Sequence, residues 1–204
     1  MIYDVVHAII RFIMTILFRP KIYGLENLPD SGPVIIASNH ISNFDPPLIA
    51  CFIPSQRPVN YMAKDELFFN AFMRWLWKNL HAFPVKRGMA DRNAIRTAIS
   101  ILQSGNIVGL FPEGTRSKTG KLGKPEPGIA MIAIKAKAVI VPCALAGTNR
   151  IFTRGCLFPQ LSMSLGKPII FECVKADKAT IESLGEKIMQ EIKMLLENNN
   201  HASN

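Results

Sequence analysis

A histidine and an aspartate follow a short apolar run, and this pair is the strongest chemical signal in the chain. His40 lies directly after the run 34–38 and its neighbour Asn39, and Asp45 comes five residues later. Because an imidazole changes protonation near neutral pH, His40 is the candidate general base. A sharp bend would let the Asp45 carboxylate accept from one ring nitrogen and stabilise the imidazolium. The pair predicts activation of a hydroxyl group, although such spacing is also typical of an ordinary polar loop.

A second polar motif, Glu113-Gly114-Thr115-Arg116, follows the apolar run 107–110. Gly114 allows a ligand to approach the backbone closely, and Thr115 offers a hydroxyl. The planar guanidinium of Arg116 matches the geometry of a phosphate group. Glu113 would accept a hydrogen bond from an alcohol and orient it. The motif predicts an anion-binding loop, and the alternative is a turn with a surface salt bridge.

Residue patterns for other chemistries are missing from the sequence. It has no Gly-x-Ser-x-Gly elbow and no histidine beside a cysteine, so no covalent enzyme intermediate is indicated. No third ligand stands near His40, and we expect neither a metal ion nor a cofactor. Cys51, Cys143 and Cys173 lie in or beside apolar runs, which predicts buried thiols in a reducing compartment. The hydroxyl to be activated must therefore belong to the substrate.

The net charge of +9 is unevenly distributed along the 204 residues. Residues 177–204 carry five acidic and three basic residues, so residues 1–176 carry a net charge of +11. Such a field attracts phosphate groups or an anionic membrane surface. Lys86 and Arg87 form one basic pair, which predicts a second phosphate contact or, alternatively, solvated surface charges. Nucleic acid is the rival polyanion, but the aromatic residues are not interleaved with the basic ones as a stacking platform requires.

Apolar strands alternating with amphipathic helices predict an α/β fold. We expect a single domain whose mixed, largely parallel sheet is covered by helices on both faces. A proline is expected at the end of one strand, at Pro142. Expected strands are 34–38, 60–63, 107–111, 139–142 and 161–165, and expected helices begin at Pro46 and Pro47 or span 91–103, 128–138 and 179–197.

Residues 2–18 predict an N-terminal helix that associates with a membrane. Asp4, His7 and Arg11 share one helical face, and most of the remaining surface is apolar. Because a bilayer span needs about 20 apolar residues, we expect this helix to lie in the membrane interface rather than cross it. A helix packed into the core is the alternative.

The stretch 68–83 has an unusual aromatic content and contains both tryptophans of the chain. Its basic residues Arg74 and Lys78 would share a face with His81 if the whole stretch were helical. Tryptophan flanked by basic residues favours a membrane–water interface. An aromatic-rich packing helix is the equal alternative.

Four segments, taken in order, resemble the conserved blocks of the glycerophospholipid acyltransferases, in particular the lysophosphatidate acyltransferases. The third block is a near-complete match, and the resemblance covers about residues 21–170. The four segments are Asn39-His40 with Asp45, Phe83-Pro84-Val85-Lys86-Arg87, Phe111-Pro112-Glu113-Gly114-Thr115-Arg116-Ser117 and Ile140-Val141-Pro142.

The resemblance implies that His40, supported by Asp45, deprotonates the free hydroxyl of lysophosphatidate. The hydroxyl then attacks the thioester of acyl-CoA or acyl-acyl-carrier protein, and phosphatidate forms. It also implies that Arg87 and Arg116 hold the acceptor phosphate. The acyl donor is implied by the resemblance alone.

This reading divides the chain into an interfacial helix at 1–20, an acyltransferase domain at 21–197 and a flexible tail at 198–204. We expect the enzyme at the cytoplasmic face of a membrane, with no nucleic-acid partner. The alternatives are a different lysolipid acceptor or a non-catalytic module that binds anionic membranes.

Overall fold

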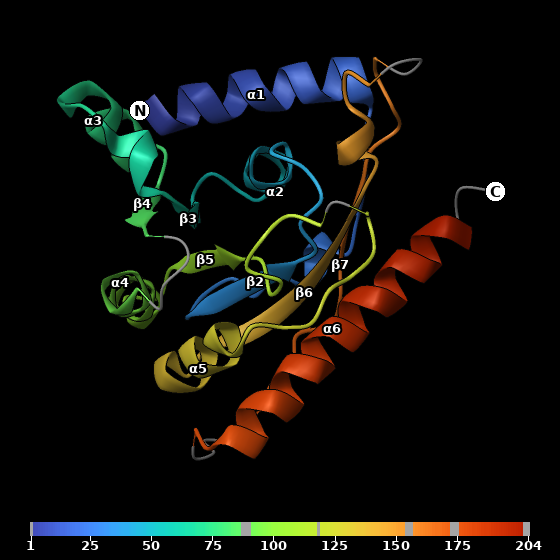
Figure 1. The fold of residues 1–204 in the computed structure, drawn as a ribbon. Coiled ribbons are helices and arrows are strands. Elements are labelled where there is room, and N and C mark those ends of the chain that lie inside the picture. The colour runs from blue at the N-terminus through green and yellow to red at the C-terminus, as the bar shows by residue number, and fades with distance from the viewer. Residues whose placement is uncertain (1, 87–90, 118, 154–156, 172–175, 202–204) are drawn as a thin grey trace.

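A seven-stranded sheet forms the centre of the computed structural model, which describes residues 2–86, 91–117, 119–153, 157–171 and 176–201 (Figure 1). The strands are β1 (Lys21–Tyr23), β2 (Val34–Ser38), β3 (Val59–Lys64), β4 (Ala82–Val85), β5 (Ile107–Leu110), β6 (Val139–Ala146) and β7 (Ser162–Leu165). Their order is β1-β7-β6-β2-β5-β3-β4, and only the pairing of β6 with β7 is antiparallel. The predicted mixed, largely parallel sheet is confirmed.

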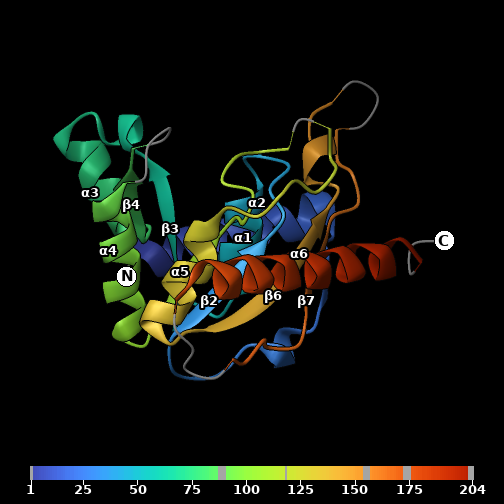
Figure 2. The same cartoon turned by 60° about the horizontal axis from the view of Figure 1, so that its bottom comes forward.

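Helices cover both faces of this sheet. Figure 2 shows α5 and α6 in front of the strands and α1 and α2 behind them. Two buried clusters result, because alternate residues of β2 point to opposite faces: Ile35 packs toward α4, α5 and α6, whereas Ile36 packs toward α1 and α2. The helices are α1 (Ile2–Phe18), α2 (Asp45–Phe52), α3 (Ala71–Asn79), α4 (Arg92–Gln103), α5 (Pro127–Ala136) and α6 (Lys178–His201).

Local sequence signals set several of these boundaries. The Asp91 side chain accepts from the backbone N–H groups of Asn93 and Ala94, so it caps α4 where the sequence predicts a cap. Pro46 and Pro47 lie in the first turn of α2, where a proline costs no helical hydrogen bond. The expected strands at β2 and β5 are present as well.

The expectation that Pro142 ends its strand is wrong, because β6 continues to Ala146. The Pro142 carbonyl accepts from the N–H of Gly166, which lies on the β7 side. Since the N and O of one strand residue point to the same side, the missing N–H of Pro142 faces away from β2. It also lies before the ladder with β7, which begins at Cys143. The proline therefore costs no bond in the ladder with β2.

The stretch 68–83 is not one helix. Asn70 caps α3 by accepting from Met73 N–H at 2.8 Å, and the chain leaves the helix at His81, which has a left-handed φ of 57°. Phe83 consequently lies in β4 rather than on a helix. Both β4 and the short edge strand β1 are absent from the expected set.

The C-terminal helix α6 extends to His201, so the expected helix end at 197 is wrong by four residues. The predicted N-terminal helix is confirmed as α1. None of the helices in the described ranges combines the length and apolar character needed to cross a bilayer.

Candidate active site

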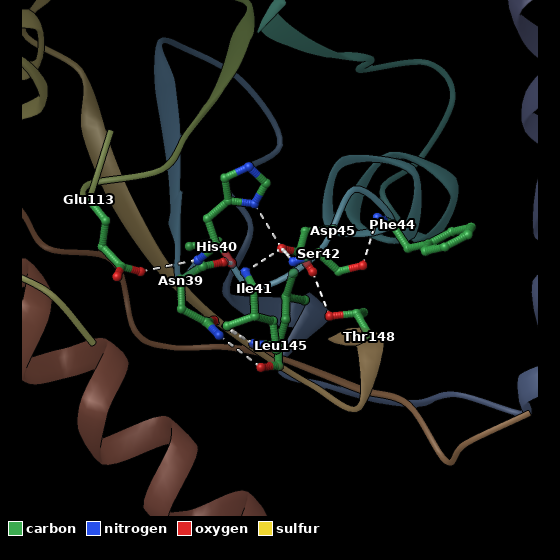
Figure 3. A network of polar contacts seen from close by, with 10 residues as sticks. Asn39, His40, Ile41, Ser42, Phe44, Asp45, Glu113, Leu145 and Thr148 are labelled. Atoms are coloured by element: carbon green, nitrogen blue, oxygen red, sulfur yellow. Dashed lines mark hydrogen bonds and ion pairs between the residues drawn. The ribbon is translucent and has the colours of Figure 1, made fainter. Parts of the chain in front are cut away.

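Three neighbouring parallel strands deliver polar side chains to one edge of the sheet. His40 follows β2, Glu113 follows β5 and Thr148 follows β6. The register pairs Ala37 with Leu110 and with Pro142, so these three strands run side by side toward the same edge. In open α/β sheets, ligands bind at this carboxyl edge. Figure 3 shows the polar network that forms there.

The Asp45 carboxylate lies at the centre of this network. Its Oδ2 is 2.8 Å from His40 Nδ1 and accepts from the N–H groups of Ile41 and Ser42, each at 2.7 Å. Its Oδ1 accepts from the Thr148 hydroxyl at 2.6 Å. The tight turn between His40 and Asp45 brings the two side chains together, as the sequence hypothesis requires (Figure 3).

These contacts fix which ring nitrogen of His40 carries the proton. Asp45 is fully buried and surrounded by N–H and O–H donors, which is the environment of an acceptor carboxylate. His40 Nδ1 therefore donates to Asp45, and Nε2 keeps its lone pair. A base oriented in this way can take a proton from a hydroxyl group.

Aromatic rings hold the His40 imidazole from one side. The Phe111 ring stacks on it at a centroid distance of 3.9 Å and 17° between the planes. Tyr61 stacks behind Phe111 at 6.3 Å and 19°. Gly109 makes room for Tyr61, because a Cβ at this position would lie 2.2 Å from the Tyr61 ring. The tyrosine hydroxyl is buried without a hydrogen-bond partner among the described residues, and burial raises its pKa well above 10.

Asn39 links the end of β2, which His40 follows, to the neighbouring strand β6. Its side-chain N–H donates to the carbonyl of Leu145 at 2.9 Å, and Leu145 N–H donates to Asn39 Oδ1 at 2.8 Å. The Asn39 side chain thus continues the pairing of β2 with β6 one residue past the end of β2. These two bonds hold the start of the turn that runs from His40 to Asp45.

Glu113 connects the second motif to the first. Its Oε1 accepts from the backbone N–H of His40 at 3.2 Å, and its Oε2 accepts from Gly123 N–H at 2.9 Å. Ser117 N–H donates to the carbonyl of His40 at 2.8 Å. Both carboxylate oxygens therefore contact the backbone, so Glu113 positions the two motifs relative to each other. The expected contact of Glu113 with an alcohol stays a prediction.

A cavity of about 700 Å³ lies in front of His40. Lys86, Gly114 and Thr115 line it, so three of the sequence-predicted binding residues share a space with the base. Arg116 is exposed outside its lining, and Arg87 lies outside the described residues. Much of the remaining wall is apolar, with Met62, Val85, Ala94, Ile95, Leu110 and Met131.

Within the described ranges, no three histidine, cysteine or carboxylate side chains cluster as a metal site would require. Cys51 and Cys143 are free and buried, and burial raises the pKa of each thiol to about 12. This confirms the expected buried environment for these two, whereas Cys173 lies outside the described residues. Neither thiol has the character of a nucleophile.

Sequence reasoning missed several residues of this site. Thr148 lies 103 positions from Asp45, and no local pattern relates the two. Tyr61 and Gly109 looked like ordinary strand residues. Asn39 and Phe111 lie inside the quoted motifs without an assigned function, and the available signal is their position, one residue before His40 and two residues before Glu113.

Comparisons with known proteins agree with this geometry. A family model described as Acyltransferase matches residues 19–146. The 1-acyl-sn-glycerol-3-phosphate acyltransferase of Bacillus subtilis is 34% identical over 164 residues, which cover 78% of each chain. The chloroplastic 1-acyl-sn-glycerol-3-phosphate acyltransferase LPAT1 of Arabidopsis thaliana is 32% identical over 68% of this chain and 39% of its own length.

A solved structure shares the whole fold. The crystal structure of the 1-acyl-sn-glycerophosphate acyltransferase PlsC from Thermotoga maritima superposes with a TM-score of 0.78 at 25% sequence identity. The match covers 97% of this chain and 79% of the other. It therefore includes all layers of the fold described above.

Proposed function

Because the chain belongs to the glycerophospholipid acyltransferase family, we propose that it transfers a fatty acyl group from a thioester to the free hydroxyl of lysophosphatidate, giving phosphatidate. The names of its relatives support this acceptor. The observation that carries the proposal is the oriented His40 imidazole, whose Nδ1 is held by Asp45 at the wall of a cavity that also contains Lys86.

In the proposed reaction, His40 Nε2 takes the proton of the acceptor hydroxyl. The hydroxyl oxygen forms a bond to the thioester carbon, and the carbon–sulfur bond breaks when the tetrahedral intermediate collapses. The departing thiolate takes the proton from the imidazolium, so atoms and charges balance. Asp45 stabilises the positive ring between these two steps.

Lys86, Arg87 and Arg116 are the proposed contacts for the acceptor phosphate. Lys86 lines the cavity beside His40. Arg116 is exposed at the end of the second motif, and a guanidinium there matches a phosphate monoester. The apolar part of the cavity suits an acyl chain, and the proposed donor is acyl-CoA or acyl-acyl-carrier protein.

The proposed location is the cytoplasmic face of a membrane. The outer side of α1 exposes a continuous apolar stripe, formed by Val5, Ile9, Phe12, Ile13 and Ile16. Its opposite side packs on the protein through Met14 and Phe18, and His7 Nε2 contacts the Ile53 carbonyl at 3.0 Å. A helix that turns its apolar side outward suits the interface of a bilayer. Free buried cysteines suit a reducing compartment.

The test is an acyl-transfer assay with a labelled acyl thioester and lysophosphatidate in detergent micelles. We expect the purified protein to form labelled phosphatidate, and His40→Ala to lose at least about a thousandfold in kcat with an unchanged melting temperature. Asn43→Ala changes a neighbouring turn residue and is the control. Supplying acyl-CoA and acyl-acyl-carrier protein in parallel identifies the donor.

Two outcomes would contradict the proposal. Transfer to a different lysolipid but not to lysophosphatidate would reassign the acceptor. If the protein binds membranes normally but consumes no acyl thioester with any lysolipid supplied, the non-catalytic membrane-binding module is favoured.

A further inference from the structure

A second cavity, of about 600 Å³, lies away from His40 at the edge of the sheet. Its lining residues belong to α3, β4 and the 3-10 turn at Asp65–Phe68. Figure 1 shows α3 next to the start of α1. It shares no lining residue with the cavity in front of His40. The catalytic proposal therefore leaves this cavity without a function.

Two cations from α3 face this cavity. Arg74 and Lys78 are four residues apart, one helical turn, and both line it. Arg74 Nε donates to the carbonyl of Phe68 at 3.0 Å, which orients the guanidinium and leaves its terminal nitrogens for a ligand. Among the described residues, neither cation lies within ion-pair distance of a carboxylate. Asp65 is the one acidic residue of the lining, so the cavity is net positive.

Exposed aromatic rings lie next to this positive cavity: Phe69 lines it, and Phe72 and Trp75 belong to the helix that carries its two cations. Phe69 is 70% exposed, Phe72 60% and Trp75 49%. Phe72 and Trp75 stack on each other at 5.9 Å on the same helix that carries the cations. A basic cavity on a helix that also exposes aromatic rings is complementary to a phosphate that is attached to a lipid rather than free in solution.

We propose that this cavity binds the phosphate headgroup of an anionic glycerophospholipid of the membrane, with Arg74 and Lys78 as the phosphate ligands. The exposed rings of Phe69, Phe72 and Trp75 enter the membrane interface beside that lipid. Tyr3 of α1 contacts His81, which follows the C-cap of α3, with ring centroids 4.7 Å apart, so the first turn of α1 packs beside the end of α3. The site is distinct from the acceptor site, and its existence does not depend on the catalytic proposal.

Tryptophan fluorescence gives a local test, because both tryptophans of the chain lie on α3. The protein is titrated with dihexanoyl phosphatidylglycerol and dihexanoyl phosphatidylcholine, both below their critical micelle concentrations, and separately with inorganic phosphate. We expect a saturable change with the anionic lipid, and at least about tenfold weaker responses to the other two probes.

Variants then locate the binding. Lys78→Gln removes one of the two positive charges and should weaken the anionic-lipid response by about fivefold or more. Arg74→Lys keeps the charge but loses the planar guanidinium, and we expect a loss of similar size. The matched control is Lys187→Gln, which removes an exposed charge from α6 on the far side of the sheet. Micellar turnover with lysophosphatidate should be unchanged in all three variants.

Equal responses to the anionic and zwitterionic lipids, or an unchanged response in both α3 variants, would overturn the proposal. A response to inorganic phosphate as strong as that to the lipid would also overturn it, because a lipid would then not be required. Loss of micellar turnover in Lys78→Gln would assign the cavity to the acceptor instead.

Discussion

The carboxylate that orients the base depends on a hydroxyl from a distant part of the chain. Thr148 is buried and donates to Asp45 Oδ1, and an unsatisfied buried acceptor costs about 1–3 kcal/mol. Valine has the shape of threonine without the donor. We predict that Thr148→Val lowers kcat by about tenfold and leaves KM for the acceptor nearly unchanged, as measured by steady-state kinetics.

Thr148→Ser is the matched control, because it keeps the hydroxyl and should retain most of the turnover. A turnover in Thr148→Val equal to that of the original protein would show that the other contacts of Asp45 are sufficient.

Gly109 is required by the ring packed against it rather than by its backbone conformation. A Cβ there would meet the Tyr61 ring at 2.2 Å, and the displaced Tyr61 would push on the Phe111 ring that stacks on His40. We predict that Gly109→Ala lowers the free energy of unfolding by about 1–3 kcal/mol and also lowers kcat. Urea unfolding and the transfer assay measure the two effects.

The double variant Gly109→Ala/Tyr61→Leu separates the causes. Removing the ring should restore much of the lost stability, so the two substitutions should be strongly non-additive. Additive losses would mean that Tyr61 is not the obstacle.

At the scale of elements, one capping residue contacts both a helix and a residue of the proposed acceptor site. Asp91 caps α4 and also accepts from the backbone N–H of Lys86 at 2.9 Å. The bond from Lys86 N–H, followed by that from Ala94, lowers the pKa of Asp91 below its usual 3.8. A lowered folded-state pKa stabilises the protein above the unfolded value, and this contribution is lost as the pH falls through the folded value.

We therefore predict that Asp91→Ala lowers the melting temperature at pH 7 and raises KM for lysophosphatidate, because Lys86 loses its tether. The difference in melting temperature should shrink below about pH 4, where the carboxyl is protonated. Thermal unfolding at several pH values measures it, with Asn93→Ala as the control on the same turn. A difference independent of pH would contradict a charge-dependent cap.

Some elements could be predicted from the sequence because their signals are local. The apolar run of β2 and the cap of α4 identify themselves within a few residues. Other features depend on residues far along the chain. Whether β6 can continue past Pro142 depends on which side of that strand is paired, and β1 is a strand because it pairs with β7. In the same way, the bend from His40 to Asp45 could be anticipated, but the contribution of Thr148 required the fold.

For the whole molecule, the apolar side of α1 should decide how strongly the protein binds membranes. Phe12 and Ile16 are 66% and 54% exposed on that side. Burying one such side chain is worth about 1.5–3 kcal/mol. We predict that Phe12→Ser and Ile16→Ser each weaken vesicle binding by at least about tenfold, as measured by sedimentation, without changing turnover in detergent micelles.

Ile170→Ser is the control for that experiment, since Ile170 is 77% exposed next to Ile169, which pairs with Ile140 in the sheet. Equal losses in this variant and in the α1 variants would indicate a general surface effect.

The mutual bonds between the two motifs also limit how such an enzyme can be redesigned. His40 N–H donates to Glu113 and the His40 carbonyl accepts from Ser117, so the loop proposed to recognise the acceptor is fastened to the backbone of the base. A loop transplanted from a relative with another acceptor preference would arrive with different anchor points. A successful graft should therefore carry both segments together, with specificity and reactivity inherited as one unit.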